Sequence, residues 1–444
     1  MRILFLEVDS ERSWALASMG PGFLAAYLRA HGHAAVFLRI AVDATVDEVV
    51  ARARALAPDL LGLSLTTRQW LRARELVAAV RRELDVPVVA GGLHPTFAPE
   101  AVLASPGFDY VCMGEGEAPL LDLVEALEAG RSTDNIDNIW TRGGERPGLR
   151  QPFAPLDALP FIARDVLDEP NGVIHVSTQR GCPFPCTYCA ARMYDQLYEG
   201  NGDYGRRRSV AGVMEELQGL AHASKLAYVI FLDDTFTIHH PWVREFCSVY
   251  GRELGAPFSL HARVETVNQK LLDTLAAAGC QQITYGVESG SERVRRQVMH
   301  RPVTNQRFRD VFRWTREAGI QVTANYMLGL PGETAADLQQ TLDLATELDI
   351  LDFGYFVFYP YPGTHLFQVC RERGYLPDNY LELPANHRQS ILDLPGLSKD
   401  EIARCYDGFT ALRRQRYAHR LGPDAALEDH ATAADHVDES AAMG

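Results

Sequence analysis

The sequence predicts an α/β protein built on two separate sheets, and three observations support this prediction. Strand-like apolar runs and amphipathic helices alternate over residues 1–135, and the same alternation resumes over residues 171–370. The stretch between these two regions is rich in glycine and proline, which is typical of a linker. The chain has 444 residues, more than one hydrophobic core usually serves, so we expect more than one domain.

The first region begins with a largely apolar run at residues 2–8, which predicts a buried strand. Further elements are predicted as strands at 35–40, 60–65, 86–90 and 110–113 and as helices at 21–31, 46–56 and 68–84. Strands at this spacing, connected by helices, form an open parallel sheet. Ligands of such sheets bind beyond the carboxyl ends of the strands, which here are residues 64–67, 91–96 and 114–117.

Residues 136–170 are predicted to be a linker, because turn-forming residues are dense and hydrophobic periodicity is weak. The second alternating region follows. Its predicted strands are 173–177, 228–232, 258–261, 282–287, 322–328 and 353–358, and its helices include 210–222, 268–278 and 305–318.

The end of the chain is predicted to be helical and then disordered. Residues 371–421 form a helical region, whose long helix begins at Ser398 with acidic residues in its first turn. Residues 422–444 are rich in alanine, aspartate and histidine without periodicity, so we expect a disordered tail. His430 and His436 are interpreted as part of that composition rather than as metal ligands.

Composition and charge exclude some classes of protein and of partner. Apolar residues make up 47% of the chain, no apolar run reaches the length of a membrane span, and the N-terminus begins a strand rather than a signal peptide. Eight cysteines without a regular framework indicate a reducing compartment, so we expect a cytoplasmic protein. A formal net charge of −15 disfavours nucleic acid as a partner. It suits a cationic or neutral small substrate, although a solvated acidic surface is the simpler explanation.

Three cysteines, Cys182, Cys186 and Cys189, lie within eight residues directly after a predicted strand. They cannot all pair as disulfides, and a tetrahedral zinc needs a fourth ligand that no nearby residue supplies. Thiolates also bind iron–sulfur clusters, and three of them on a four-iron cube leave one iron open. A zinc knuckle or a reduced cysteine cluster remains an alternative.

The spacing Cys-x3-Cys-x2-Cys, with Tyr188 before the last cysteine, resembles the signature of the radical S-adenosylmethionine (SAM) superfamily. The resemblance implies a partial (βα)6 barrel over residues 171–370 and a [4Fe-4S] cluster on Cys182, Cys186 and Cys189. SAM would bind the open iron and be split by one electron to methionine and a 5'-deoxyadenosyl radical. The resemblance also implies an electron donor such as flavodoxin or ferredoxin.

The same resemblance assigns residues to SAM. Tyr188 would lie against the adenine, Arg263 would pair with the methionine carboxylate, and the Gly-Val-Glu-Ser-Gly motif would supply polar anchors. Glycines in the segment 327–332 would let the backbone approach the adenine. The complete set of predicted cofactor-binding residues is Tyr188, Asp234, Arg263, Glu288, Ser289, Gly329 and Gly332.

Asp233, His261 and Glu265 are the candidates for a general acid or base, since each follows a predicted strand at the carboxyl end of the barrel. Asp233 and Glu265 also have structural interpretations, as a helix cap and as one partner of a surface ion pair. Aromatic residues in the segment 359–364 are expected to border the substrate cavity.

The first region resembles the cobalamin-binding-type (B12-binding-like) domain that precedes the barrel in one large radical SAM subfamily. Small residues at the strand ends would leave room for a corrin ring, but the Asp-x-His-x-x-Gly motif is missing. Arg68, Gln69 and Trp70 follow directly after Thr66 and Thr67, where a corrin needs space. Bound cobalamin and a fold that has lost this ligand therefore both stay open. His94 at the next strand end is interpreted as a turn or interface residue.

The reaction predicted from these features is the radical dehydration of a diol to a ketone in an aminoglycoside. The chain would then resemble the radical SAM diol dehydratase of apramycin biosynthesis. Crowding after Thr67, the short chain beyond the barrel and the acidic net charge favour this reaction. The alternatives are cobalamin-dependent C-methylation in natural-product biosynthesis, a cyclisation or ring rearrangement, and a non-catalytic corrinoid-binding partner or sensor.

Overall fold

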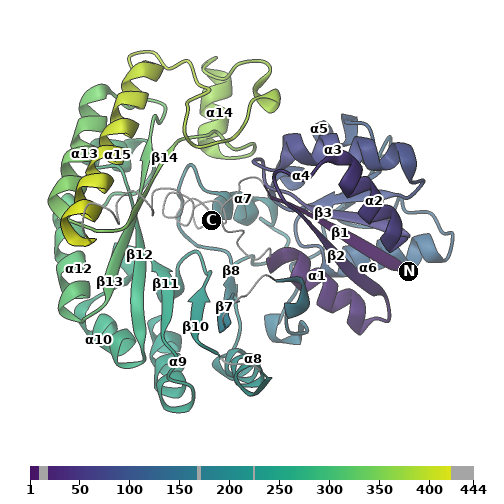
Figure 1. Ribbon diagram of the computed structural model, residues 1–444, viewed down its shortest axis with the longest axis horizontal. Coiled ribbons are helices and arrows are strands. Elements are labelled where there is room, and N and C mark those ends of the chain that lie inside the picture. The colour runs from purple at the N-terminus through teal and green to yellow at the C-terminus, as the bar shows by residue number, and fades with distance from the viewer. Residues whose placement is uncertain (10–18, 168–171, 224–225, 422–444) are drawn as a thin grey trace.

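The structure is a computed structural model that describes residues 1–9, 19–167, 172–223 and 226–421. The chain forms two lobes, each built on a six-stranded sheet, and the carboxyl ends of both sheets point toward the space between the lobes (Figure 1). The predicted tail, with His430 and His436, lies outside the described residues.

The first sheet has the strand order β2-β1-β3-β4-β5-β6. Its strands are β1 (Arg2–Val8), β2 (Ala34–Ile40), β3 (Leu60–Ser64), β4 (Val88–Gly91), β5 (Tyr110–Cys112) and β6 (Ile139–Thr141). All neighbouring pairs are parallel except β5 and β6. The chain direction across the sheet reverses between β1 and β3, and such a switch point is where open parallel sheets bind ligands.

Helices cover both faces of this sheet because its strands are apolar on both sides. In β1, Leu4 and Leu6 pack on one side, while Ile3 and Phe5 pack on the other. Helices α1 (Met19–Ala30) and α6 (Glu117–Glu128) cover the Phe5 side, and the opposite side is covered by α2 (Val46–Leu56), α3 (Trp70–Glu83) and α5 (Pro99–Ala104). The short helix α4 (Leu93–Phe97) follows β4 at the carboxyl end.

The second sheet is parallel throughout, with the strand order β14-β13-β12-β11-β10-β7. Its strands are β7 (Val173–Val176), β10 (Tyr228–Phe231), β11 (Phe258–Ala262), β12 (Cys280–Glu288), β13 (Gln321–Leu328) and β14 (Phe353–Val357). The helices are α7 (Ala190–Leu197), α8 (Val210–Ala223), α9 (His240–Glu253), α10 (Gln269–Ala277), α11 (Glu292–Gln297), α12 (Asn305–Glu317), α13 (Ala335–Leu348), α14 (His365–Glu372) and α15 (Lys399–Leu421). The predicted partial barrel is therefore confirmed.

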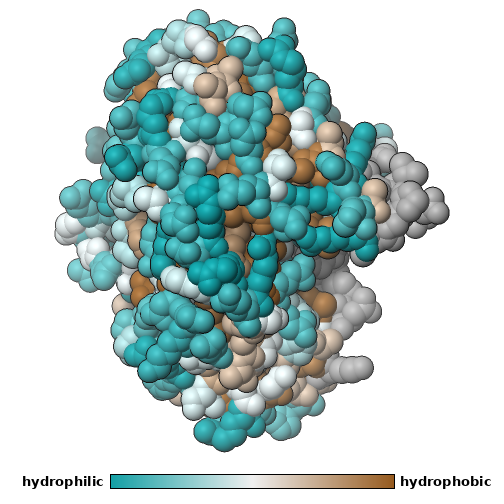
Figure 2. All heavy atoms as spheres, turned by 90° about the vertical axis from the view of Figure 1, so that its left-hand side faces the viewer, coloured by the Kyte–Doolittle hydropathy of each residue, from teal (hydrophilic) through white to brown (hydrophobic). Residues whose placement is uncertain are grey.

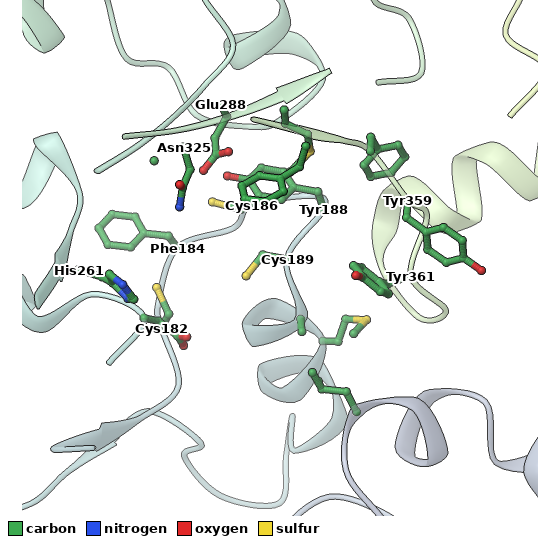
Figure 3. A pocket seen from close by; sticks show the side chains of 18 of the residues that line it. Cys182, Phe184, Cys186, Tyr188, Cys189, His261, Glu288, Asn325, Tyr359 and Tyr361 are labelled. Carbon is green, nitrogen blue, oxygen red and sulfur yellow. The ribbon is translucent and has the colours of Figure 1, made fainter. Parts of the chain in front are cut away.

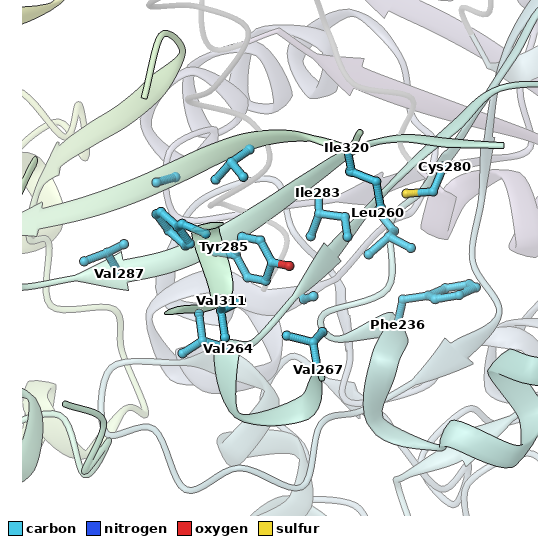
Figure 4. Packing of buried hydrophobic residues seen from close by; sticks show 14 of the residues in the cluster. Phe236, Leu260, Val264, Val267, Cys280, Ile283, Tyr285, Val287, Val311 and Ile320 are labelled. Carbon is cyan, nitrogen blue, oxygen red and sulfur yellow. The ribbon is translucent and has the colours of Figure 1, made fainter. Parts of the chain in front are cut away.

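The core of the second lobe lies between these strands and the outer helices. Ile283 and Tyr285 of β12 pack there with Val311 of α12, and Leu260 of β11 packs beside them (Figure 4). Tyr285 keeps its hydroxyl satisfied by a 3.0 Å hydrogen bond with Thr315. Because large apolar side chains fill this layer, the carboxyl ends of the strands have a rigid support.

Two features differ from the predictions. Strand β6 lies inside the stretch predicted as a linker, where Ile139, Trp140 and Thr141 pair antiparallel with β5 and extend the first sheet. Between α14 and α15, the predicted helical region contains mainly irregular chain with one 3-10 turn at Tyr380–Glu382. That irregular chain passes close to the space between the lobes, and α15 packs against β14 and α13.

Buried ion pairs join the two lobes next to the cysteine motif. Glu115, in the turn between β5 and α6, and Glu117, the first residue of α6, both pair with Arg180, and Glu115 also pairs with Arg206. The Arg180 Nη1 to Glu115 Oε1 distance is 2.9 Å. Arg180 belongs to the short β8–β9 ribbon (Gln179–Arg180 and Arg206–Arg207) that precedes the cysteines.

Replacing Arg180 with methionine should lower the free energy of unfolding by about 3–5 kcal/mol, because two carboxylates would remain buried with one cation between them. Denaturant unfolding followed by circular dichroism measures this change. Arg74→Met is the matched control, since the Arg74–Glu382 pair also joins the lobes but is exposed, and should cost at most about 1 kcal/mol. Equal losses of unfolding free energy in the two variants would contradict the conclusion that buried ion pairs of Arg180 join the two lobes.

The surface formed by the outer barrel helices is mostly hydrophilic, with hydrophobic side chains in small separate patches (Figure 2). Among the described residues, Phe161 is the single large hydrophobic side chain that is exposed, at 44%. The described helices include none with the length and apolar character needed to cross a membrane.

Candidate functional site

The predicted cysteine motif lies in the loop between β8 and α7, at the carboxyl end of the second sheet. Gly181 begins this loop with a φ of +82°, and a Cβ there would meet the Tyr204 ring at 2.9 Å and its carbonyl oxygen at 3.1 Å, so glycine is required. Cys182, Cys186 and Cys189 are all free and surround one cavity of about 210 Å³ (Figure 3). We call this the cysteine cavity.

The surroundings of the three thiols fit an iron–sulfur cluster. Burial raises the pKa of Cys182 to about 11 and that of Cys189 well above its usual value, so thiolates here need positive charge nearby. Arg263 supplies one such charge, with Nη1 3.0 Å from Cys186 Sγ. Within the described residues, no three potential ligands surround a point that suits a single metal ion. This arrangement disfavours the zinc alternative and suits a cluster, in which each thiolate binds a different iron.

A polar wall of the cysteine cavity is formed by Glu288 and Arg301, whose carboxylate and guanidinium lie 3.6 Å apart. Glu288 has a φ of +66° at a β-bulge that turns its side chain toward the cavity. Burial raises its pKa, although Arg301 opposes the shift. Asn325 on β13 lines the same wall, and its buried Oδ1 has no hydrogen-bond donor among the described residues. A ligand that brings hydroxyl or ammonium donors would satisfy this wall.

Two of the three predicted acid–base residues have structural roles. The Asp233 carboxylate accepts hydrogen bonds from the Thr178 and Gln179 amides at 2.7 and 3.0 Å and from the Thr178 hydroxyl at 2.5 Å. Glu265 pairs with Arg263 at 2.5 Å and with Arg301 at 3.5 Å. Neither carboxylate lines the cysteine cavity. Both carboxylates therefore have hydrogen-bond or ion-pair partners in the folded chain, and proton transfer by Asp233 or Glu265 stays a prediction.

His261 and Asp234 do line the cysteine cavity, as predicted. Burial lowers the pKa of His261 to about 4, so its imidazole is neutral at pH 7. Burial and the neighbouring Asp233 raise the pKa of Asp234 to about 7. Asp234 also lines a second cavity, which makes it the carboxylate at the junction of the two.

The other predicted cofactor-binding residues divide into two groups. Tyr188 lines the cavity, and both Tyr188 and Met327 pack against one apolar cluster that contains Leu330. Ser289, in contrast, is fully buried behind the cavity, where its hydroxyl accepts a hydrogen bond from the Ser291 amide at 3.2 Å. Ser289 does not line the cysteine cavity, and its contact with SAM stays a prediction.

Gly329 and Gly332 also do not line the cysteine cavity. Both have positive φ, at +83° and +85°, and a Cβ on Gly329 would meet Ile402 of α15 at 2.9 Å. Glu333 accepts hydrogen bonds from the amides of Gly329 and Leu330 and fixes this turn. These glycines therefore shape the turn after β13, and Met327 is the member of that segment that reaches the cavity.

The aromatic border predicted at residues 359–364 is present. Phe356, Tyr359 and Tyr361 line the cavity. In Figure 3, Tyr359 and Tyr361 lie across the cavity from Glu288 and Asn325. His387, from the irregular chain before α15, completes this border and was not predicted. Its position depends on a backbone hydrogen bond of 2.7 Å from the Val357 amide to the His387 carbonyl, which no local sequence pattern indicates.

A second cavity of about 330 Å³ lies at the carboxyl ends of the first sheet, beneath α1 and α6. We call it the sheet-end cavity. Glycines from α1, from β3, from the end of β4 and from the β5–α6 turn line it: Gly20, Gly62, Gly91, Gly92, Gly114 and Gly116. It adjoins the cysteine cavity, since Leu232 and Asp234 line both.

Two of the three side chains expected to crowd the space after Thr67, those of Gln69 and Trp70, turn away from it. Trp70 turns into the core of the first lobe, is 2% exposed and stacks on His94 with ring centroids 4.8 Å apart. Gln69 turns back, accepts a hydrogen bond from the Thr66 amide and donates one to the Val8 carbonyl at 2.9 Å. Neither side chain lines the cysteine cavity or the sheet-end cavity. His94 borders the cysteine cavity from the first lobe, which agrees with its interpretation as an interface residue.

Arg301 and Asn325 were also missed at the sequence level. In the second half of β13, positions that face the cavity alternate with buried apolar residues. A polar residue such as Asn325 at one of the cavity-facing positions could have indicated a binding role. Arg301 follows a short helix and is 2% exposed, and nothing in its local sequence distinguishes it from a surface arginine.

Comparisons with known proteins agree with this division into two lobes. Residues 176–345 match the model of the radical SAM superfamily, and residues 16–124 match that of the B12 binding domain. An uncharacterized methyltransferase of Pyrococcus horikoshii is 28% identical over 432 residues, covering 93% of this chain and 89% of that protein. Cytidylyl-2-hydroxyethylphosphonate methyltransferase of Streptomyces wedmorensis is 24% identical and covers 87% of this chain and 84% of that protein.

A solved structure has the same fold. The radical SAM methyltransferase TsrM from Kitasatospora setae, with cobalamin and a [4Fe-4S] cluster bound, has a TM-score of 0.69 and 19% identity. The match covers 84% of this chain and 78% of that one. These relatives are methyltransferases, so the predicted resemblance to a diol dehydratase of amino sugars is not supported, and the methylation alternative is favoured.

Proposed function

Because this chain is a radical SAM enzyme with an N-terminal B12-binding domain, we propose that it is a cobalamin-dependent methyltransferase acting on carbon in a small molecule. A radical SAM enzyme uses a [4Fe-4S] cluster, SAM and a reductant. Relatives named as methyltransferases align with nearly the whole chain and support the finer assignment.

When bound, the cluster and SAM supply a 5'-deoxyadenosyl radical that removes hydrogen from carbon, and cobalamin supplies the methyl group. Cys182, Cys186 and Cys189 would hold the cluster. Glu288 and Asn325 accept hydrogen bonds from the ligand that binds at the polar wall. These hydrogen bonds fix the orientation of that ligand. The aromatic border excludes water from the reacting atoms.

The sheet-end cavity fits a corrinoid. Gly20 and Gly91 are not demanded by local packing, because a Cβ on either would approach its nearest neighbour only to 3.5 Å. Because these two glycines have no side chains, the sheet-end cavity stays open at their positions. Ser64, Gln179 and Asp234 border it and offer polar groups to the amides around a corrin ring.

The observation that carries the proposal is that the two cavities adjoin at Leu232 and Asp234. Methyl transfer requires both cofactors beside one substrate, whereas dehydration requires the cysteine cavity alone. An amino sugar also fits poorly. Among the described residues that line the cysteine cavity, the carboxylates are Asp234 and Glu288, and Glu288 already faces Arg301.

Product analysis tests the proposal. Protein is purified anaerobically from cells supplied with hydroxocobalamin, reduced chemically and incubated with SAM whose methyl group is deuterated. We expect S-adenosylhomocysteine in addition to 5'-deoxyadenosine, because SAM serves both as methyl donor and as radical source. Formation of 5'-deoxyadenosine alone would favour dehydration or rearrangement, and absence of both products would favour a non-catalytic corrinoid-binding protein.

A further inference from the structure

The loop that carries the three cysteines has an inner side and an outer side. Its inner side borders the cysteine cavity, which residues of the first lobe also line. On the outer side, Pro183 and Pro185 are exposed, and neither lines the cysteine cavity or the sheet-end cavity. A protein that delivers electrons to a cluster on these cysteines therefore meets the loop on its outer side, because the inner side is enclosed between the two lobes.

Two exposed histidines lie next to this loop, and neither lines the cysteine cavity or the sheet-end cavity. Thr187, which follows the second cysteine, donates its amide to the Met299 carbonyl at 3.4 Å and accepts from the Leu366 amide at 3.0 Å. His300 follows Met299, His365 precedes Leu366, and the two imidazole rings lie 5.9 Å apart. Each histidine is therefore one residue away from a backbone group that is hydrogen-bonded to the neighbour of a cluster cysteine, so the path from this surface to the cluster is short.

The segment that carries His300 is held firmly against the cysteine loop. The Thr187 hydroxyl donates a hydrogen bond of 2.7 Å to the Val298 carbonyl. His300 has a φ of +54°, and its neighbours Met299 and Arg301 are 0% and 2% exposed. A left-handed backbone at a residue other than glycine persists only where the surroundings determine it. The fold therefore keeps His300 at the surface between two buried side chains.

The charges around the two histidines are opposite in sign to the net charge of the chain, which is −15. Helix α11 ends three residues before His300, and α14 begins at His365. The exposed charged side chains of these two helices, the histidine aside, are Arg293, Arg296, Arg371 and Glu372. Arg293 pairs with a carboxylate of α13, whereas Arg296 has no ion-pair partner within the described part of the chain. A partner that is drawn to this surface of an otherwise acidic protein is therefore itself acidic.

We propose that an acidic electron-transfer protein of the flavodoxin or ferredoxin class docks on the surface formed by Pro183, Pro185, Arg296, His300 and His365, which we call the donor surface. One electron leaves the reduced cofactor of that protein and enters the cluster, so the partner is oxidised and the cluster reduced by one electron each, and no bond forms or breaks. A patch of this size suits the small interfaces of transient redox complexes. The inference goes beyond the proposed function, since reduction of the cluster precedes methylation and dehydration alike, and it requires only that the three cysteines hold the cluster.

Two reductants test the inference on the reconstituted protein. A flavodoxin kept reduced by NADPH and its reductase has to dock, whereas dithionite is small and needs no docking surface. The variants are Arg296→Glu and His365→Glu, and the second places a carboxylate in the first turn of α14, where the helix dipole stabilises it. At low ionic strength we expect the rate of 5'-deoxyadenosine formation with flavodoxin to fall about three- to tenfold in each variant and the rate with dithionite to stay unchanged.

Binding of oxidised flavodoxin, measured by surface plasmon resonance, gives a readout without turnover. The dissociation constant should rise about three- to tenfold in both variants, and the affinity of the unmodified protein should fall as salt is added. Arg244→Glu is the matched control, because Arg244 is an exposed arginine on α9, which lies at the opposite end of the second lobe from α14 (Figure 1). This control should leave both the flavodoxin-dependent rate and the affinity unchanged.

Unchanged flavodoxin-dependent rates in Arg296→Glu and His365→Glu, or an equal loss in Arg244→Glu, would overturn the inference. A matching loss with dithionite would assign these residues to support of the cysteine loop and would overturn it as well. Self-association that Arg296→Glu abolishes, measured by sedimentation, would assign the donor surface to a second copy of the chain instead. The S-adenosylhomocysteine assay is independent of these measurements, so failure of methyl transfer with intact flavodoxin-dependent SAM cleavage would refute the proposed function and leave the donor surface standing.

Discussion

A Cys186→Ala variant is expected to lose the cluster and, with it, SAM cleavage. Three thiolates hold a cluster of this type, and no further cysteine lines the cysteine cavity within the described chain. Formation of 5'-deoxyadenosine should therefore fall by at least about a thousandfold. Cluster absorbance, iron content and 5'-deoxyadenosine are measured after identical anaerobic reconstitution.

Cys247→Ala is the matched control for this experiment. Cys247 is also a buried free cysteine, but it lies on α9 in the core of the second lobe. Its replacement should cost about 1 kcal/mol of stability and leave iron content unchanged. A Cys186→Ala protein that still holds a cluster and cleaves SAM would refute the ligand assignment.

A Gly91→Leu variant is expected to lose bound corrinoid while keeping the cluster. The first carbon of the new side chain fits, since a Cβ would meet Cys112 at 3.5–3.6 Å, but the remaining atoms extend into the sheet-end cavity. Overpacking of a binding cavity should reduce bound corrinoid at least about tenfold. Corrinoid absorbance per protein, measured after extraction, gives the result.

Gly91→Ala separates the volume of the side chain from the loss of glycine. Alanine adds only the Cβ that the structure accommodates, so this variant should retain corrinoid at nearly the level of the unmodified protein. Normal corrinoid content in the leucine variant would mean that the sheet-end cavity is not the corrinoid site. Loss of cluster in either variant would instead indicate misfolding.

The fold was largely predictable because its strands are buried. Strands in parallel sheets with both faces covered read as apolar runs, and β1 and the six barrel strands were predicted to within a few residues. Strand β6 was missed because three residues between turn formers have no visible period. Its pairing with β5 is determined by tertiary contact alone.

The site was predictable where a local motif determines it. Cys182, Cys186 and Cys189 lie within one loop, so their spacing in the sequence was sufficient to predict that they lie together. The contacts of Asp233 with Thr178 and of Glu265 with Arg301 could not be predicted, because these partners are distant in sequence and become neighbours only in the folded chain.

The prediction that Trp70 crowds the corrin site was wrong for a related reason. A residue that follows a strand end can turn either toward the ligand or into the core, and packing on Phe108 and His94 decides between them. With Trp70 in the core, one of the sequence-based arguments against a bound corrinoid is removed, and the comparisons favour methylation over dehydration.

The yield of S-adenosylhomocysteine as a function of bound corrinoid tests the central claim most directly. Preparations with full cluster content and graded corrinoid content are reduced with SAM in the absence of substrate. The two adjoining cavities predict a yield that rises in proportion to corrinoid, to about one S-adenosylhomocysteine per corrinoid in a single turnover. A yield of zero at full corrinoid content, or one independent of corrinoid, would contradict methyl transfer between the two lobes.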